Sequence, residues 1–430
     1  MLFLDELVTK TKENMKNEFL KDNRPWVITF SGGKDSTTVL HLTIEMLKSI
    51  PPQKRKKIYI VASDTLVEMP IITDYFYNKI NQIKEYIKKT NLNIEIEILK
   101  PNLEESFWTL LIGKGYPAPI TSFRWCTERL KIKPATKFLT GLTQNNKSIV
   151  MLLGVRKAES GNRKISIEKR ETNFRGFTKH DDIPNAFVFS PIKEWSNEEV
   201  WSFLANNKAP WGSHKDMMKL YDKGSSEADC NIALNPQDPS CGKTRFGCWV
   251  CTVVNKDKSM ENMLESEKWL KPLNDFRNML LEYRSDPTKR DKRRRNGEKG
   301  SGPYTLQVRK EFLKRLLEIE EAIKEKLNGK QLILDKEILY IQKEWEKDGD
   351  FLLSALDIAS KFGRKIDYDS FNALGKNEKE IAYKYNLTPF FINKILSVES
   401  KNKSLKRKNI FKDLDEIITG FSKGKINDNQ

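Results

Sequence analysis

Apolar and polar residues alternate in blocks along the first half of the chain. Short apolar runs predict buried strands at residues 26–30, 58–62 and 148–153, and an alternating run predicts a more exposed strand at 94–99. Apolar residues at helical spacing predict helices over residues 1–22, from about Val39 to Leu47, and over 71–87. This order of elements is typical of an α/β fold with a doubly wound parallel sheet.

Right-handed crossovers place the loops after Phe30, Ala62 and Leu153 at one edge of such a sheet. Folds of this kind bind their ligands at that edge, beyond the carboxyl ends of the strands. We therefore expect the functional residues of the first half in these three loops.

The pattern changes after residue 191. Ser196 and Glu199 predict a capping box at the start of a helix, and a loop rich in Cys, Pro, Gly and Trp follows from about 223 to 252. From about Met260 the chain has a helical and highly charged pattern. We expect an α/β domain at 1–192, a helix with a Cys-rich insertion at 193–258, a basic helical region at 259–345, and a helical C-terminal region at 346–430 with a disordered tail.

Composition narrows the class of protein. The 430 residues include 76 Lys and Arg against 59 Asp and Glu, a net charge of +17, and the mean hydropathy is −0.61. No apolar run is long enough to span a membrane, Asp5 and Glu6 interrupt the apolar N-terminus, and five cysteines are too few for a disulfide scaffold. We expect a cytoplasmic protein without membrane contact. The charge is compatible with a nucleic-acid partner, although Lys-rich surfaces also occur without one.

A glycine-containing loop lies between the first predicted strand and helix. Residues 31–36 read Ser-Gly-Gly-Lys-Asp-Ser, which is not a Walker A loop because Asp35 follows the lysine where Ser or Thr is required. The loop still fits a phosphate cradle, since backbone N–H groups and a helix N-terminus face the ligand and two hydroxyls add donors. The predicted phosphate ligands are Ser31, Gly32, Gly33, Lys34 and Ser36. Asp35 can cap the helix or help to hold Mg²⁺.

This hexapeptide resembles the PP-loop of the N-type ATP pyrophosphatases, an adenine nucleotide alpha hydrolase-like family that cleaves ATP between its α and β phosphates. Residues 63–68, 124–131 and 153–163 resemble the branch of the sulfonucleotide (PAPS) reductases. Residues 240–252 and 302–310 are similar to the DndC family of DNA phosphorothioation, a DNA modification of restriction–modification systems. The resemblance covers roughly residues 20–345.

Further candidate residues lie at the same sheet edge. Arg156 and Arg163 follow a central strand, where they can pair with phosphate or with the activated anion; surface pairing with Glu159 is the alternative. Asp64 could face ribose or Mg²⁺ or cap a helix, and Gly154 belongs to the predicted nucleotide site. We assign catalytic roles to Lys34, Asp35, Arg156 and Arg163.

Four cysteines, at 230, 241, 248 and 251, follow the spacing C-x10-C-x6-C-x2-C. Thiolates this close in a reduced compartment predict zinc or an iron–sulfur cluster. The family resemblance adds the fifth cysteine and implies a [4Fe–4S] cluster on Cys126, Cys241, Cys248 and Cys251. Cys230 is the second choice as a ligand, or a carrier of sulfur as persulfide.

Two other features bear on partners. The basic run 289–295, with Lys299, predicts either a solvated loop or an arm that follows the DNA backbone. Residues 380–396 have the spacing of a helix-turn-helix, but we favour plain helix packing, because such patterns arise often. The three histidines have no metal-ligand spacing, and His41 is expected to be packed or to cap a helix.

The resemblance implies an ATP-dependent sulfurtransferase that adenylates a DNA phosphate with release of pyrophosphate, after which sulfur displaces AMP. Its partners would be DNA, a cysteine desulfurase as sulfur donor and other phosphorothioation-pathway proteins. One alternative is a sulfonucleotide (PAPS/APS) reductase, whose mechanism needs a nucleophilic cysteine near the C-terminus, where no cysteine follows Cys251. The other is a non-catalytic DNA-binding protein with structural zinc.

Overall fold

A computed structural model describes residues 2–159, 177–224, 247–350, 352–368 and 410–422, with isolated positions between 384 and 395. It divides into two units, Met1–Pro101 with Pro119–Asn274 and Asn102–Ala118 with Asp275–Gln430. This division differs from the predicted boundaries, because segment 102–118 leaves the α/β region and joins the C-terminal helices. The reason is packing: Trp108 Nε1 donates to Leu332 O at 2.7 Å, and Trp345 Nε1 donates to Ile112 O at 2.8 Å.

The first unit is built on a six-stranded sheet with the order β3-β2-β1-β4-β6-β5. All neighbouring pairs are parallel except β5 with β6, so the predicted doubly wound parallel sheet is confirmed. The last two strands were not predicted from the sequence. The strands are β1 (Trp26–Thr29), β2 (Ile58–Ser63), β3 (Ile94–Leu99), β4 (Ile149–Leu152), β5 (Thr178–Lys179) and β6 (Ala186–Phe189).

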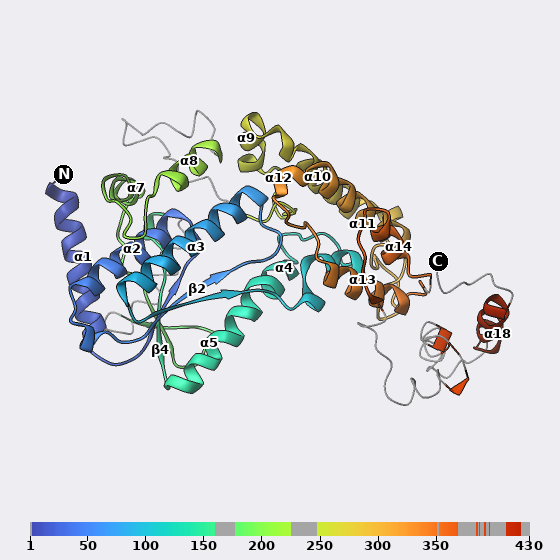
Figure 1. The fold of residues 1–430 in the computed structure, drawn as a ribbon, viewed down its shortest axis with the longest axis horizontal. Helices are drawn as coiled ribbons and strands as arrows, with labels where there is room; N and C mark the ends of the chain where they lie inside the picture. Colours follow the sequence, from blue (N-terminus) through green and yellow to red (C-terminus); the bar gives the residue numbers. More distant parts are fainter. Residues whose placement is uncertain are drawn as a thin grey trace. The chain divides into compact units, whose positions relative to one another are not determined.

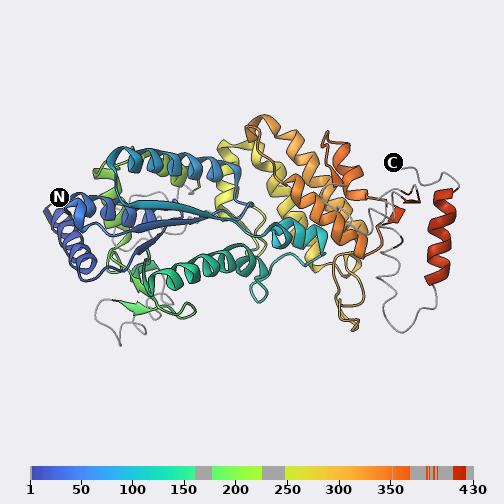
Figure 2. The same ribbon diagram turned by 60° about the horizontal axis from the view of Figure 1, so that its bottom comes forward.

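Helices cover both faces of this sheet (Figures 1 and 2). Trp26 and Ile28 of β1 belong to one buried cluster with α1 (Leu2–Leu20), α2 (Lys34–Lys48), α3 (Pro70–Thr90), α7 (Asn197–Asn206) and α8 (Lys215–Gly224). Val27, which points to the other face, packs with Leu139 of α5 (Lys133–Asn146). The two-residue periodicity of β1 therefore separates the two layers of the core. The predicted capping box is confirmed, since Ser196 Oγ accepts from Glu199 N at 3.1 Å and Glu199 Oε2 accepts from Ser196 N at 2.6 Å.

Further helices complete the first unit, and the described part of the second unit is mostly helical. The first unit also contains α4 (Trp125–Thr127) and α9 (Lys258–Ser266), and α10 (Lys271–Ser285) begins at its end. The second unit contains α11 (Leu306–Ala322), α12 (Lys324–Leu327), α13 (Asp335–Lys347), α14 (Ser354–Ser360) and α18 (Ile410–Ser422), which confirms a helical C-terminal region. Within the described ranges no helix is both long and apolar enough to cross a membrane. The helix-turn-helix candidate at 380–396 and the tail after 422 lie almost wholly outside those ranges.

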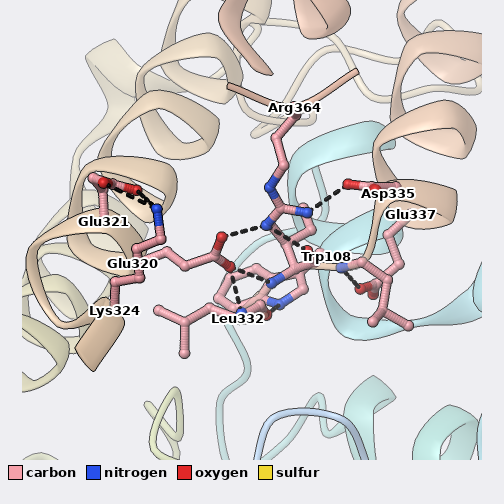
Figure 3. A network of polar contacts seen from close by, with 10 residues as sticks. Trp108, Glu320, Glu321, Lys324, Leu332, Asp335, Glu337 and Arg364 are labelled. Atoms are coloured by element: carbon pink, nitrogen blue, oxygen red, sulfur yellow. Dashed lines mark hydrogen bonds and ion pairs between the residues drawn. The ribbon is translucent and has the colours of Figure 1, made fainter. Parts of the chain in front are cut away.

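A mostly buried ionic network joins segment 102–118 to the C-terminal helices (Figure 3). Arg364 pairs with both Glu320 and Asp335, and it also donates to the Ile333 carbonyl at 3.2 Å. Glu320 in turn accepts from the backbone N–H of Leu332, whose carbonyl holds the Trp108 indole. The charged side chains of this network therefore have ion-pair or backbone hydrogen-bond partners within the second unit.

Candidate active site

The predicted phosphate loop lies between β1 and α2. Gly32 has a φ of +76°, a left-handed conformation that favours glycine, and Gly33 precedes the first residue of α2. The hydroxyls of Ser31 and Ser36 are 3.0 Å apart, and Ser36 Oγ donates to Gly33 O at 3.0 Å. Tyr75 of α3 donates to Gly32 O at 3.0 Å and so fixes the outer side of the turn. The loop is held in shape by its own hydroxyls and by a neighbouring helix.

Two cations flank the Asp35 carboxylate. Lys34 Nζ lies 2.9 Å from Asp35 Oδ2, and Arg156 Nε lies 2.6 Å from Asp35 Oδ1. Arg156 is 2% exposed and also contacts Trp195 O and Asn197 Oδ1, both at 3.4 Å. Asp35 therefore does not cap α2, because it lies within the helix and its oxygens face these cations.

The same geometry revises the expectation for Arg156, whose guanidinium lies behind Asp35 instead of among the cavity-lining side chains. It pairs with a protein carboxylate because β4 lies parallel beside β1, so the loop after β4 meets the start of α2, which follows β1. Arg163, the other predicted arginine, lies outside the described residues.

Gly154 brings the loop after β4 directly against the phosphate loop. A Cβ at this position would lie 2.8 Å from Asp35 C and 2.9 Å from Ser36 N, closer than real Cβ contacts. Since β1 and β4 are adjacent parallel strands on either side of the point where the strand order reverses, their carboxyl ends form one crevice. Glycine at 154 permits this close approach.

A cavity of about 610 Å³ opens at this crevice. Its walls include all of residues 31–36 together with Asp64, Gly154 and three tyrosines, Tyr75, Tyr77 and Tyr221. Asp64 does not cap α3, whose preceding residue is Met69; its Oδ2 accepts from Tyr77 OH at 2.5 Å and its Oδ1 accepts from Leu66 N at 2.9 Å. The nucleotide-site residues predicted at 31–36, 64 and 154 thus surround one cavity.

The cavity extends to residues that lie beside Cys248, although none of the three described cysteines is among its lining residues. Glu68, Lys131 and Gly247 also line it, and Glu68 forms an antiparallel backbone bridge with Cys248. Thr65 Oγ1 lies 3.4 Å from Cys248 Sγ. Burial, with the nearby Glu68 carboxylate, raises the pKa of Cys248 to about 12, while the Lys131 charge opposes that rise.

The three described cysteines gather at this end of the site. Burial raises the pKa of Cys126, and the neighbouring Cys251 thiol adds to the rise; Cys126 acts in the same direction on Cys248. As they stand, the described side chains contain no group of three or more His, Cys, Asp or Glu in position to hold a metal ion. The donor set nevertheless fits a soft metal in kind, since thiols are soft ligands and the three come from two segments near enough to affect one another's pKa. Cys230 and Cys241 lie outside the described residues.

Contacts with residues 299–304 shape the basic run. Bridges pair Arg290 with Tyr304 and Arg293 with Lys299, and Arg290 also donates to Gly302 O. Residues 292–295 remain exposed. The run therefore forms a short folded hairpin of the second unit that presents several cations to solvent.

Sequence reasoning missed the tyrosines of the cavity and the buried histidine pair. His41 Nδ1 lies 3.2 Å from His214 Nε2, although 173 residues separate the two, and His41 Nε2 lies 3.3 Å from Glu45 Oε1. The expectation that His41 is packed is confirmed, since it is fully buried. No local pattern around His214 or Tyr221 could have indicated their partners on α2.

A known protein family matches the part of the chain that contains this site. Residues 25–254 match the phosphoadenosine phosphosulfate reductase domain, so the chain belongs to that family, a branch of the PP-loop ATP pyrophosphatases whose members are typically enzymes. An uncharacterised protein of Methanocaldococcus jannaschii is 28% identical over 270 residues, which are 63% of this chain and 44% of that protein. The chain thus spans less than half the length of this curated relative.

Three solved structures match parts of the chain at low similarity. A phosphoadenylyl-sulfate (PAPS) reductase from Candida auris has 14% identity and a TM-score of 0.32, covering 50% of this chain and 90% of that one. An FMN adenylyltransferase from Candida glabrata has 16% identity and a TM-score of 0.31, with coverages of 52% and 60%. A U34-tRNA thiolase from Methanococcus maripaludis, solved with its [4Fe–4S] cluster, has 14% identity and a TM-score of 0.32, with coverages of 66% and 78%.

Proposed function

We propose that this protein is a DndC-type, ATP-dependent sulfurtransferase that adenylates a DNA phosphate and replaces one of its non-bridging oxygens with sulfur. The observation that carries the proposal is the continuity of one cavity, which runs from the phosphate loop at 31–36 to Glu68, Lys131 and Gly247 beside Cys248. Nucleotide activation and sulfur delivery need such a shared space, because the activated phosphate must meet the sulfur before water does.

The phosphate loop would bind the pyrophosphate part of ATP. Backbone N–H groups at the start of α2 and the hydroxyls of Ser31 and Ser36 supply donors, and Lys34 offsets the charge that develops on the leaving group. Arg156 would act through Asp35, keeping the carboxylate and Lys34 in place. Mg²⁺ carried by ATP would find protein oxygens on Asp35 and Asp64, which both line the cavity.

The chemistry would take two displacements at phosphorus. A phosphate oxygen of DNA attacks the α phosphorus of ATP, and pyrophosphate leaves with the electrons of the broken bond. The terminal sulfur of a cysteine persulfide then attacks the DNA phosphorus, and AMP leaves. A second thiol attacks the carrier sulfur of the resulting P–S–S linkage, so that a disulfide forms and the sulfur remains on DNA. The persulfide would come from a partner cysteine desulfurase.

A [4Fe–4S] cluster is the cofactor that we propose for the cysteines, as the family resemblance implies. Cys126, Cys248 and Cys251 would hold it together with Cys241, with Cys230 as the second choice for the fourth ligand or as the persulfide carrier. When bound, such a cluster supplies iron that can accept electrons or sulfur. Structural zinc on the same thiols is the alternative.

The hairpin at 290–304 is the proposed contact with DNA. Residues 292–295 expose four consecutive cations, while Arg290 is held by the carbonyl of Gly302. Cations arranged in this way bind phosphates without reading sequence, which suits an enzyme whose substrate is the DNA backbone. Other proteins of the phosphorothioation pathway would supply the site and access to it.

ATP–pyrophosphate exchange and DNA-dependent AMP formation test the reaction. Ser31→Ala and Lys34→Ala should each lower exchange by on the order of a hundredfold, because each removes a group from the developing charge. Lys54→Ala, an exposed lysine outside the site, is the matched control and should keep the wild-type rate. In cells, the same two variants should abolish DNA sulfur detected by mass spectrometry of nuclease digests; unchanged DNA sulfur would contradict the catalytic role.

The family match favours a second candidate, a sulfonucleotide reductase. A sulfite-release assay with PAPS or APS and a thiol reductant separates the two, and we expect no sulfite, because no cysteine follows Cys251 in the 430 residues. Protein purified without oxygen should be brown, with absorbance at roughly 400 nm. Colourless protein with stoichiometric zinc and no exchange activity would instead support a non-catalytic DNA-binding role.

A further inference from the structure

We propose that the Tyr221 hydroxyl is a direct ligand of the pyrophosphate group, supplied by α8 in addition to the loop and α2. This inference rests on the proposed function, because it assigns a residue to the same ATP site. It adds a donor that lies 187 residues from the phosphate loop and that no motif of the loop includes.

The position of the hydroxyl carries the proposal. Tyr221 OH accepts a hydrogen bond from the backbone N–H of Lys34 at 3.4 Å, so it lies where the first N–H of α2 points. It is also only 3.2 Å from the place that a Cβ on Gly33 would occupy. Side chains of Leu220 and Tyr221 form part of the cavity wall that includes residues 31–36. An anion that approaches the helix N-terminus must therefore meet this hydroxyl.

The chemistry of the phenol fits that place. Burial, with the nearby Asp35 carboxylate, raises the pKa of Tyr221 to about 12. The hydroxyl therefore stays protonated at neutral pH and can donate to a phosphate oxygen while its own oxygen accepts from a backbone N–H. A hydrogen bond to a charged acceptor is stronger than one between neutral groups, which makes this contact worth more when the anion is bound.

The start of α8 is fixed by contacts with the two helices that flank the cavity. His214, just before α8, lies 3.2 Å from His41 of α2. Asp216 pairs with Lys79 of α3 at 3.0 Å, and Lys79 also donates to Ser213 O at 2.9 Å. The Tyr221 ring meets Trp201 of α7 edge to face, with centroids 5.0 Å apart. These contacts set the hydroxyl in place before a ligand arrives, which lowers the entropic cost of binding.

The other two tyrosines of the cavity have different partners. Tyr75 OH donates to Gly32 O and therefore supports the turn, and Tyr77 OH donates to Asp64. Tyr221 alone among these three is hydrogen-bonded to an N–H group of the anion site. Their roles can thus be separated by removing single hydroxyls.

Calorimetric binding of inorganic pyrophosphate and of AMP to the full chain tests the assignment. Tyr221→Phe should weaken pyrophosphate binding by about tenfold to a hundredfold, the usual effect of losing a hydrogen bond to a charged group, and should change AMP binding less than twofold. Tyr86→Phe on α3, which is outside the cavity, is the matched control and should leave both affinities unchanged.

The outcomes distinguish the two levels of inference. Retained AMP binding in Tyr221→Phe shows that the variant is folded, so a selective loss of pyrophosphate binding supports the assignment. Equal pyrophosphate affinity in wild type and Tyr221→Phe overturns it and leaves the proposed function intact. A wild-type protein that binds neither AMP nor pyrophosphate overturns both.

Discussion

The phosphate site of the first unit and the ionic network of the second both pair an arginine of low exposure with carboxylate groups, yet they differ in what surrounds the arginine. Arg156 holds Asp35, whose other oxygen faces Lys34 beside backbone N–H groups and a cavity of about 610 Å³. Arg364 holds Glu320 and Asp335, and its further partner is the carbonyl of Ile333 (Figure 3). The first arrangement leaves donors available at a cavity, whereas the second joins charge to charge and to backbone.

The comparison shows that a buried ion pair does not by itself indicate a functional site. Ion pairs with a purely structural role can also be buried and can also shift the pKa values of their members. What distinguishes the first unit is that a cation and a helix N-terminus line the same cavity. An anionic ligand that enters this cavity can bind both of them. The following predictions separate the two regions by experiment.

The largest effect is expected from Arg364→Met. The side chains of Arg364 and Glu320 are 10% and 14% exposed. Without the arginine, the Glu320 carboxylate keeps only the backbone N–H groups of Leu332 and Ile333 among its described partners. The free energy of unfolding should therefore fall by about 3 kcal/mol, the lower end of the range for breaking a buried pair. Urea unfolding measures this loss. ATP affinity, measured in buffer without urea, should be unchanged, because Arg364 belongs to the second unit and the cavity to the first.

Arg156→Met is the counterpart of that experiment. It should lower both stability and ATP affinity, because Asp35 and Lys34 lose the contact that places them beside the cavity. If Arg364→Met also weakened ATP binding, the separation of the two regions would be wrong.

The next effect is an acid sensitivity of the first unit. Burial, with the neighbouring His41 and Lys79 charges, lowers the pKa of His214 from 6.5 to about 4. Below pH 6.5 the unfolded chain binds a proton that the folded chain takes up only near pH 4, so stability should fall by about 3 kcal/mol as the pH drops through this window. His214→Gln removes that titration and should flatten the dependence between pH 6.5 and 4.

Glu45, which contacts His41, should make stability depend on pH over a lower range than His214 does. The His41 hydrogen bond lowers the pKa of Glu45 from 4.5 to about 2, so the stability it contributes is lost as the pH falls from 4.5 towards 2. Unfolding midpoints measured at several pH values distinguish the two windows. A His214→Gln protein that is as acid-sensitive as wild type between pH 6.5 and 4 would argue against the histidine as the cause.

Local sequence patterns allowed part of the phosphate site in the first unit to be predicted. The phosphate loop and Gly154 follow directly from strands whose apolar runs are evident, and parallel strands bring their carboxyl ends to one edge. The gathering of Cys126, Cys248 and Cys251 was expected only through the family resemblance, because 122 residues separate the first from the second. Spacing in the sequence alone allowed zinc or a cluster.

Contacts between distant segments could not be predicted. Tyr221 meets Lys34 across 187 residues, and Trp108 meets Leu332 across 224. Neither the tyrosine nor the tryptophan stands in a pattern that differs from ordinary core packing. The place of segment 102–118 in the second unit could not be predicted for the same reason. Apolar side chains can pack in the core of either unit, and the sequence pattern does not specify which.

A smaller effect separates the phosphate loop from the rest of its unit. Gly154→Ala places a Cβ against the backbone of Asp35 and Ser36, which cannot move as a side chain end can, so it should cost about 1–3 kcal/mol and weaken ATP binding. Gly141→Ala in α5 is the matched control, because no atom lies within 4 Å of its Cβ. Removing a glycine from a helix interior should raise stability by up to about 1 kcal/mol and leave ATP binding unchanged. Calorimetry of both variants with ATP tests the contrast.

The smallest effect is expected at the edge of the second unit's network. Lys324 lies 3.4 Å from Glu321, but the two side chains are 70% and 57% exposed (Figure 3). Water screens an exposed pair and its side chains lose entropy when they are held together, so Lys324→Ala should change the free energy of unfolding by less than about 0.5 kcal/mol. Urea unfolding of Lys324→Ala and Arg364→Met under the same conditions compares the two losses of unfolding free energy directly. A loss comparable to that of Arg364→Met would mean that Lys324 is part of the buried network, and burial would then no longer explain why Arg364 matters.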